Sequence, residues 1–522
     1  MESWPLKGET IMTDWNEGYV TDLDYTYGYY GELNPVRIKL AFLNVGIKFP
    51  TIGTACELGF GQGVSANIHA AASTTTWHGN DFNPAQAGFA QELSRISGSS
   101  SKFEAESFEE FCARPDLPEY DFIALHGIWS WVSDHNRNLI VDFIRRKLKV
   151  GGVLYISYNT LPGWSAFAPI RNLLTKHSKY YGAEGHGRAA NIESAIQSVD
   201  VLVASNPKYL QGNTHAINKF EHLKGEDRGY LAHEYFNKDW EPMYFSDMAE
   251  WLEPAMLSYA CSANYIDHLD VANLTKQQQE HLSGITHPIY KETVRDIMTN
   301  QQFRKDYWVK GPRKLTKTER LDLVKNIRVV LTKKASAISL KATGSRGEVS
   351  FAEKLYKTVL NEIEISNSPT LGELEIALEK DGITLAQIFE VSIALSGTGA
   401  LCIAQEPEMT KIAQEATDKL NDHLIEKAVL GSTVNFLASS VIGGGIGVDR
   451  FNQLFISAVR KGHNSPEQLA EFVWNLMCLQ NQKLTIKNKV LQTPEENLEE
   501  LTKGAKKFID EYLQAFQNLN LC

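Results

Sequence analysis

Cysteine is scarce and scattered in this sequence, and its pattern argues against two kinds of site. The chain has 522 residues and six cysteines, no two of which form a CxxC pair. Disulfide-rich secreted domains and cysteine-based zinc sites both depend on closely spaced cysteines. We therefore expect free thiols in a reducing compartment, no bound metal and a cytoplasmic location.

Long apolar runs and an excess of positive charge are also absent. No run approaches the roughly 18 apolar residues of a membrane span, and the N-terminus lacks the basic and apolar segments of a secretory signal. The chain has 63 acidic and 52 basic residues, which gives a net charge of −11. The lack of a long apolar run leads us to expect no membrane insertion. Because phosphate contact needs clustered positive charge, we also expect no nucleic-acid binding.

The first 160 residues predict an α/β domain. Strand-like and helix-like segments alternate, a pattern typical of βαβ units and of a parallel sheet with helices on both faces. Strands are expected over 51–58, 74–79, 120–125 and 152–157. Helices are expected over 65–72, 85–96, 108–113 and 135–148.

The periodicity changes after this first part of the chain. Between 166 and 229 apolar residues recur every three or four positions, which predicts a helical insert. A helix over 245–257 and a strand over 257–263 then complete the sheet. We expect an α/β domain, a helical insert that mediates a homodimer, a middle domain and a helical C-terminal domain, with bounds of 1–165 plus 230–300, 166–229, 301–405 and 406–522.

The second half of the chain offers no site for chemistry. Residues 304–346 carry 13 Lys/Arg against three Asp/Glu, and we favour neutralisation of acidic neighbours over a partner surface. Residues 350–405 have the order of a winged-helix module, three helices followed by a short strand pair. Its third helix, 383–395, lacks the Lys and Arg that reading DNA requires. The glycine run 443–447 lacks the Lys-Ser/Thr of a phosphate loop and predicts a turn before a helix that begins near Asp449.

A glycine-rich loop at 56–63, with the sequence CELGFGQG, carries the chemistry. It follows a strand and opens a helix, and its glycines permit a tight turn and the close approach of a ligand. The dinucleotide fingerprint GxGxxG fails, because the sixth position counted from Gly59 is Val64. Glu57, two residues before the first glycine, suits S-adenosylmethionine instead, since that molecule carries a cationic ammonium and sulfonium.

Acidic residues at the ends of the next two strands suit the same ligand. Asp81 lies 18 residues after Gly63 and is expected to bind the ribose hydroxyls. Glu106 follows the third strand position and is expected to flank the adenine. The full set of expected cofactor contacts is Glu57, Gly59, Gly61, Gly63, Asp81, Asn83, Glu106, Ser107, Phe108 and His126.

Over about residues 15–165 these motifs resemble the class I S-adenosylmethionine-dependent methyltransferases. The phrases LHGIWSWV (125–132), SYNTLPGW (157–164) and YLAHEYF (230–236) resemble the bacterial methyltransferases that carry a regulatory domain. Among those are the rickettsial-type protein lysine methyltransferases, which modify outer-membrane surface proteins. The resemblance implies a Rossmann-like sheet, S-adenosylmethionine as cofactor, and a protein lysine amine as acceptor.

The segment after the fourth strand also favours an aliphatic amine. It reads HGIW at 126–129, where methyltransferases of DNA bases or glutamine carry Asn/Asp-Pro-Pro-aromatic. An aliphatic amine must lose a proton and be aligned with the methyl carbon, and aromatic walls suit a lysine stem. The candidate acceptor-site residues lie upstream, after strands four and five, or after the insert: Tyr25, Tyr29, Tyr30, Trp129, Tyr158, Asn159, Trp164, His233 and Glu234.

The leading hypothesis is therefore a methyltransferase that acts on lysine side chains of a protein. A small-molecule N- or O-methyltransferase is the alternative enzyme, and a scaffold that senses the cofactor is the alternative without catalysis. We expect residues 350–522 to do no chemistry and to hold a macromolecular substrate, because a small metabolite needs no such extended surface.

Overall fold

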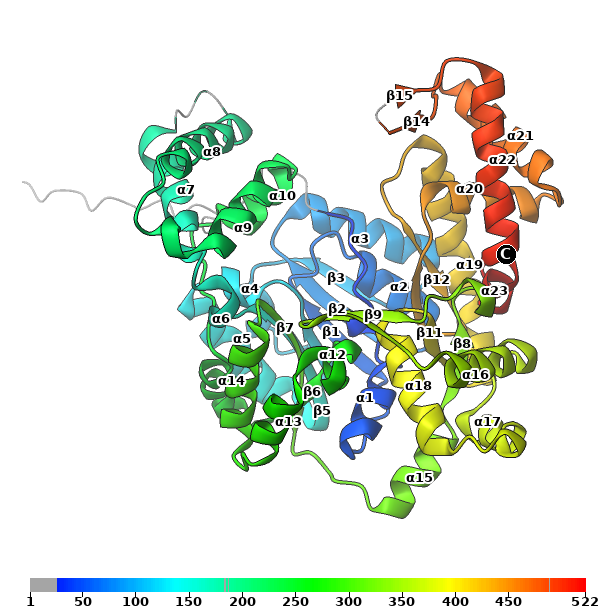
Figure 1. Cartoon of the computed structure of the whole chain (residues 1–522), viewed down its shortest axis with the longest axis horizontal. Coiled ribbons are helices and arrows are strands. Elements are labelled where there is room, and N and C mark those ends of the chain that lie inside the picture. Colours follow the sequence, from blue (N-terminus) through cyan, green and yellow to red (C-terminus); the bar gives the residue numbers. More distant parts are fainter. Residues whose placement is uncertain (1–25, 183–184, 186, 488) are drawn as a thin grey trace, which may run out of the picture. The chain divides into compact units, whose positions relative to one another are not determined.

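The computed structural model describes residues 26–522 except 183, 184, 186 and 488, and it contains a seven-stranded sheet (Figure 1). The strand order is β3-β2-β1-β4-β5-β7-β6. β1 to β5 run parallel, whereas β7 is antiparallel to its neighbours β5 and β6. The strands are β1 (Thr54–Leu58), β2 (Thr76–Asp81), β3 (Lys102–Ala105), β4 (Tyr120–Leu125), β5 (Leu148–Asn159), β6 (Leu257–Ser262) and β7 (Phe303–Lys310).

Helices connect these strands where the alternating pattern predicts them, so the expected α/β sheet is confirmed. Side-chain caps fix two of the starts: Asn83 accepts the amide of Ala85, and Ser107 forms a capping box with Glu110. The antiparallel β7 was not predicted. The helices of this domain are α1 (Ile38–Val45), α2 (Val64–Ala72), α3 (Pro84–Ser97), α4 (Phe108–Ala113), α5 (Asp134–Lys147), α6 (Leu161–Trp164), α11 (Phe245–Leu252), α12 (Asp270–Asn273), α13 (Lys276–Ser283) and α14 (Pro288–Thr299).

The helical insert forms a compact unit of its own, made of residues 164–241 with Ser130–Ser133. Its helices are α7 (Ala168–Tyr181), α8 (Arg188–Ala204), α9 (Thr214–Lys224) and α10 (Arg228–Tyr235). Each helix contributes to a separate apolar core, for example through Leu174, Ile196, Phe220 and Leu231. The insert is helical as predicted, and the compact unit continues past the expected end at 229, so α10 belongs to it.

The middle region contains the three expected helices but a different strand pairing. β11 (Leu401–Ala404) follows the third helix and pairs antiparallel with β8 (Arg328–Leu331), which precedes the first helix. The strand pair therefore does not follow the helices, as the sequence pattern suggested, but joins the two ends of the module. The remaining elements are α15 (Lys317–Lys325), β9 (Lys341–Gly344), β10 (Gly347–Ser350), α16 (Glu353–Ser366), α17 (Leu371–Ala377) and α18 (Leu385–Gly397).

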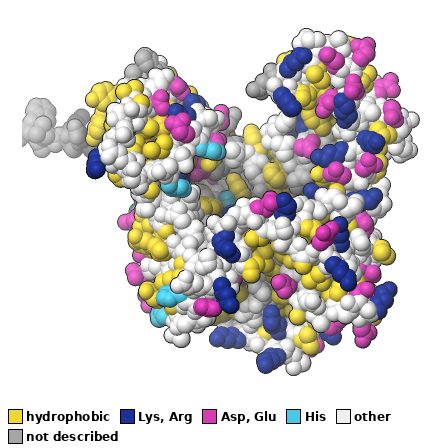
Figure 2. Space-filling view, in the orientation of Figure 1, with side chains coloured by type: hydrophobic (Ala, Val, Ile, Leu, Met, Phe, Trp, Pro, Cys, Tyr) yellow, Lys and Arg dark blue, Asp and Glu magenta, His cyan; other side chains and the backbone are white. Residues whose placement is uncertain are grey.

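The basic segment 304–346 is largely matched by carboxylates. Ion pairs of 2.7–3.1 Å join its cations to acidic residues elsewhere or nearby, among them Lys305–Glu32, Arg313–Glu319, Lys325–Glu375 and Lys341–Glu348. Over the C-terminal helices, too, Lys and Arg are interspersed with Asp and Glu on the face seen in Figure 2. These pairs support the neutralising interpretation of the segment.

The C-terminal helices pack directly on the sheet domain. α19 (Pro407–Leu430) lies against α2 and α3 (Figure 1). The Thr417 hydroxyl donates to the carbonyl of Ala71 at 3.0 Å, and the Gln405 amide donates to that of Ala72 at 2.9 Å. The other C-terminal elements are β12 (Phe436–Ser439), β13 (Gly444–Gly447), α20 (Arg450–Arg460), α21 (Pro466–Leu479), β14 (Thr485–Ile486), β15 (Lys489–Val490), α22 (Pro494–Glu511) and α23 (Leu513–Asn518).

The glycine run at 443–447 is mostly a strand rather than the expected turn. Its last four residues form β13, which pairs antiparallel with β12. Asp449 then caps α20, as predicted, by accepting the amide of Asn452. Within the described part of the chain, no helix has the length and apolar character needed to cross a bilayer.

Candidate functional site

The glycine-rich loop between β1 and α2 forms the tight turn that its sequence predicts. Gly59, Gly61 and Gly63 all have left-handed backbones, with φ of +67°, +59° and +66°. A Cβ on Gly59 would lie 2.6 Å from Ile128, and one on Gly63 would lie 2.5 Å from Ala90. Only glycine satisfies both the backbone conformation and the close packing here, so the loop presents its backbone to the space above it.

Asp81 holds this loop from the end of β2. One carboxylate oxygen accepts the amide of Gly61 at 2.9 Å, and the other accepts the amide of Asn83 at 2.9 Å. Burial raises the pKa of Asp81 to about 6, although the two amides oppose that rise. Each oxygen keeps a lone pair for a further donor, so the expected ribose contact is compatible with the geometry and stays a prediction.

Glu57 is the most unusual group of the site. Its side chain is 3% exposed, and its Oε2 has no hydrogen-bond partner among the described residues. Burial, together with the nearby Asp81 carboxylate, raises the pKa of Glu57 to about 8. A buried carboxylate without a partner is costly, and a cationic ligand would relieve that cost.

Four of the expected cofactor contacts, Asn83, Glu106, Ser107 and Phe108, follow β2 or β3, and two of them cap helices. Ser107 and Asn83 use their side chains to cap α4 and α3. Glu106 binds Arg114 through Oε1, while its Oε2 is buried without a described partner. The Phe108 ring lies beside Gly59. Phe108 and Glu106 are therefore near the loop, whereas Ser107 and Asn83 hold the helices that frame it.

His126 stands at the end of β4 in an aromatic environment. Its ring stacks on Tyr30 with a centroid separation of 3.6 Å, and its Nδ1 lies 2.7 Å from the Tyr155 hydroxyl. Burial lowers the pKa of His126 to about 3, which leaves the ring neutral at pH 7. The backbone amide of Tyr30 donates to Ser65 of α2 at 2.8 Å, so the segment before α1 is tied to the glycine loop's helix.

Three neighbours of His126 were not predicted from the sequence. Tyr155 comes from β5. Lys305 of β7 and Glu32 form a 2.7 Å ion pair. The negative charge of Glu32 acts to raise the pKa of both His126 and Tyr155. Burial acts to raise the pKa of Glu32, but Arg37 and Lys305 outweigh it and lower the pKa to about 2. No local pattern marks these residues, because Tyr155 and Lys305 are placed by the pairing of β5 with β4 and with β7, and Glu32 by its contact with Lys305.

Two of the predicted acceptor-site residues, Tyr158 and Trp129, are buried in contacts with residues other than His126. The Tyr158 hydroxyl donates to Asp306 at 2.9 Å in a buried ionic network, and Tyr158 points to the face of β5 opposite to Ser157 and Asn159. Trp129 is fully buried, and its indole nitrogen lies 3.3 Å from the sulfur of Met243. Asn159 shares the face of Ser157, whose hydroxyl accepts the amide of Gly127.

Three of the other expected acceptor-site residues, Trp164, His233 and Glu234, lie in the helical unit. Trp164 packs against Trp240 and Tyr235, with the ammonium of Lys219 3.3 Å from its ring centroid. His233 is buried and Glu234 partly buried on α10, and burial raises the pKa of Glu234 to about 7. The sheet unit and the helical unit are separate, so a shared site remains a prediction. Tyr29 binds the C-terminal region, and Tyr25 lies outside the described residues.

Comparisons with known proteins agree with this geometry. The family model described as "Predicted methyltransferase regulatory domain" matches residues 227–310. Protein sll1526 of Synechocystis sp. is 38% identical over 513 residues, which cover 97% of this chain and 99% of that protein. Protein RP789 of Rickettsia prowazekii is 25% identical over 312 residues, which cover 58% of this chain and 54% of RP789.

A solved structure shows the same fold over nearly the whole chain. PKMT2 from Rickettsia typhi, in complex with AdoHcy, has a TM-score of 0.68 at 18% identity and covers 95% of this chain and 99% of its own. The likeness therefore includes the sheet, the helical insert and the mainly helical C-terminal half. The chain therefore belongs to one family with the Synechocystis protein, it contains the predicted methyltransferase regulatory domain, and it has the fold of PKMT2.

Proposed function

We propose that this protein is a class I S-adenosylmethionine-dependent methyltransferase that methylates lysine side chains of a protein in the cytoplasm. The observation that carries the proposal is the buried, unpartnered Oε2 of Glu57 beneath a glycine loop that presents its backbone. A carboxylate held in this way favours a cationic ligand. The resemblance to rickettsial-type protein lysine methyltransferases supports a protein amine as the acceptor.

The residues around the loop fit S-adenosylmethionine. Glu57 would face its cationic amino-acid part, Asp81 its ribose hydroxyls, and Phe108 with Glu106 its adenine. When bound, the cofactor supplies a methyl group activated by a sulfonium. The chain's own contribution is the rigid loop, held by the bonds from Gly61 and Asn83 to Asp81, which fixes the position of that group.

The acceptor side would be formed by Tyr30, His126 and Tyr155. A lysine amine attacks only as a neutral group, so its proton must leave before transfer. Because the pKa of His126 is about 3, this ring accepts a hydrogen bond at neutral pH but holds a proton poorly. We therefore assign His126 and Tyr155 to aligning the amine, and the proton acceptor to another group or to water.

A cavity beside Glu32, called the Glu32 cavity below, supports a macromolecular acceptor. It has a volume of about 600 Å³ and is lined by Glu32 and Arg37 of the N-terminal segment and by Thr398, Gly447 and Tyr512 of the C-terminal half. Glu32 also pairs with Lys305 near His126. A protein segment bound here would be held by both halves of the chain, next to the Glu32–Lys305 pair that lies near His126.

The test is a transfer of labelled methyl from S-adenosylmethionine to whole-cell protein and metabolite fractions. We expect label in protein, at lysine by amino-acid analysis. Label in metabolites alone would favour a small-molecule methyltransferase, and no label anywhere would favour the cofactor-sensing scaffold. Asp81→Ala serves as the inactive variant, and Glu415→Ala, which removes an exposed ion pair on α19, is the matched control.

A further variant separates protein substrates from small ones. Thr398 is exposed at the rim of the Glu32 cavity. The substitution Thr398→Trp should therefore obstruct a protein segment that binds there. We expect protein methylation to fall at least tenfold while the affinity for S-adenosylmethionine is unchanged. Ser366→Trp, at an exposed end of α16, controls for the added indole. Equal activity of both variants would contradict the substrate-holding role.

A further inference from the structure

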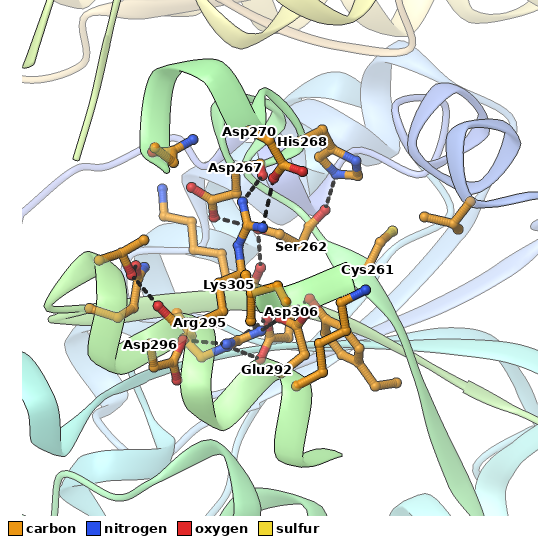
Figure 3. A pocket seen from close by; sticks show the side chains of 18 of the residues that line it. Cys261, Ser262, Asp267, His268, Asp270, Glu292, Arg295, Asp296, Lys305 and Asp306 are labelled. Atoms are coloured by element: carbon orange, nitrogen blue, oxygen red, sulfur yellow. Dashed lines mark hydrogen bonds and ion pairs between the residues drawn. The ribbon is translucent and has the colours of Figure 1, made fainter. Parts of the chain in front are cut away.

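A polar cavity of about 350 Å³ lies beside β6 and β7, apart from the glycine loop (Figure 3). Its walls come from the end of β6 and the following turn, from α14 and from the start of β7. With the exception of Val45, every lining residue falls within 227–310, the part matched by the methyltransferase regulatory domain. Methyl transfer, as proposed above, assigns no role to this cavity.

One buried guanidinium in its wall faces three carboxylates. Arg304 pairs with Asp296 at 2.5 Å, with Glu292 at 2.9 Å and with Asp306 at 2.9 Å. The side-chain exposure of Arg304, Asp296 and Asp306 is 5% or less. A further N–H of Arg304, on Nη2, donates to the hydroxyl of Tyr259 at 3.0 Å. One positive charge therefore faces three carboxylates, and negative charge remains in excess around it.

One carboxylate oxygen of Asp296 has no cation or other donor to pair with in the described part of the chain. Its Oδ1 accepts from Arg304, but its Oδ2 is buried and has no partner among the described residues. Burial raises the pKa of Asp296 to about 7, with Asp306 and Glu292 adding to the rise and Arg304 opposing it. An unmatched carboxylate oxygen in a cavity wall is a site for a donor that the chain itself does not supply.

The other charges of the wall do not cancel the excess. Asp270 is neutralised by Arg295 at 2.7 Å, and Lys305 is already neutralised by Glu32 from outside the cavity. Asp267 accepts from Ser262 and Asn264 but pairs with no described cation. Lys291 is the one lining cation for which the described residues provide no ion pair. The cavity thus keeps a net negative character, with Lys291 at one side.

We propose that this cavity binds a small aliphatic amine in its ammonium form, with N–H groups directed at Asp296 and Glu292. An ammonium supplies several donors and a charge in one group, which is what the unmatched carboxylates lack. A metal ion fits less well, because Arg304 already occupies the centre of the carboxylates and no metal-binding cluster is found among the described residues. The volume and the charge favour a compact diamine.

The test is calorimetric titration of the full chain with 1,4-diaminobutane at constant ionic strength. We expect saturable binding that 1,4-butanediol, a neutral molecule of similar size, does not reproduce. Absence of binding by the diamine, or equal binding of the diol, would overturn the proposal. Tight binding of Mg²⁺ or Ca²⁺ at the same residues in place of the diamine would also overturn it.

Two substitutions test where the ligand binds: one removes a negative charge from the cavity wall and the other removes a positive charge. Asp296→Asn keeps the acceptor for Arg304 but removes the charge at Oδ2, and we expect diamine affinity to fall at least tenfold. Lys291→Gln removes the unpaired cation and should raise the affinity several-fold. Glu292→Gln, which is more exposed than Asp296, repeats the first test if Asp296→Asn does not fold. Unchanged affinity in Lys291→Gln and in the folded carboxylate variant would overturn the assignment.

Discussion

The hydroxyl of Tyr29 accepts a 2.7 Å hydrogen bond from the backbone amide of Gly445, 416 residues further along the chain. Tyr29 precedes the Tyr30 that stacks on His126, and Gly445 lies in β13 of the C-terminal half. A Cβ on Gly445 would lie 2.9 Å from the Tyr29 ring and 3.0 Å from Ile68. The C-terminal half therefore holds the segment next to the candidate site and is part of the same packed structure.

Substitution of this glycine should loosen that contact. We expect Gly445→Ala to lower the free energy of unfolding by about 1–3 kcal/mol, the usual cost of overpacking, as measured by urea unfolding. Gly431→Ala is the control, because a Cβ on Gly431 meets nothing within 4 Å. Equal stability of the two variants would show that the Tyr29 contact tolerates a wider separation.

Asp81 is expected to contribute directly to cofactor binding. Asp81→Ala removes acceptors for the two backbone amides and for the expected ribose hydroxyls, each hydrogen bond to the charged group being worth roughly 1.5–3 kcal/mol. We expect the affinity for S-adenosylmethionine, measured by calorimetry, to fall at least tenfold. Unchanged affinity in a folded Asp81→Ala protein would refute the assignment.

The two raised carboxyl pKa values predict a pH-dependent effect of the cofactor. The pKa values of Glu57 and Asp81, about 8 and about 6, lie above their ordinary values of 4.5 and 3.8. The folded chain without ligand thus binds these protons more tightly than the unfolded chain, and its stability falls as pH rises from about 4 to 8. A cationic ligand favours the ionised carboxylates and offsets that loss.

The shift in Tm caused by S-adenosylmethionine should therefore be larger at pH 8 than at pH 6. Glu57→Gln keeps the shape of the side chain but cannot ionise, so it should flatten this dependence. Thermal unfolding with and without cofactor at both pH values measures the effect. An equally steep dependence in Glu57→Gln would assign the titration to another group.

Local patterns predict the glycine loop and the carboxylates near it, whereas the surroundings of His126 depend on long-range pairing. Glu57, Asp81 and the three glycines follow from strand ends and loop spacing, which neighbouring residues determine. His126 was expected, but Tyr155 reaches it through the pairing of β4 with β5, and Lys305 comes near through the antiparallel pairing of β5 with β7. Trp129 was predicted as an acceptor wall because it follows a strand. Its packing on Met243 and Trp251 depends on tertiary contacts that the sequence does not reveal, and its role stays a prediction.

Tyr158 and Tyr155, close together on β5, should behave differently when their hydroxyls are removed. Tyr158→Phe leaves the buried Asp306 with one donor fewer, so we expect a loss of roughly 1–3 kcal/mol in stability with little change in methyl transfer per folded molecule. Tyr155→Phe removes the partner of His126 and should lower transfer with the cofactor affinity unchanged. A severe loss of transfer in stable Tyr158→Phe would restore its predicted role at the acceptor site.

The helical unit is expected to mediate a homodimer. Its interior already has a complete core, so any association must use the apolar side chains that remain outside: Tyr181 on α7 and Val201 on α8 are 78% and 74% exposed. Because α7 and α8 pack against each other, a partner subunit that covered both helices would remove these two apolar side chains from water. We expect sedimentation of the intact chain to give a dimer at micromolar concentration, and the double variant Tyr181→Glu/Val201→Glu to give a monomer.

The control is Tyr290→Glu, at a side chain of α14 that is 61% exposed. This variant adds a negative charge outside the helical unit and should remain dimeric. A monomeric wild-type chain, or a dimeric double variant, would contradict association through α7 and α8.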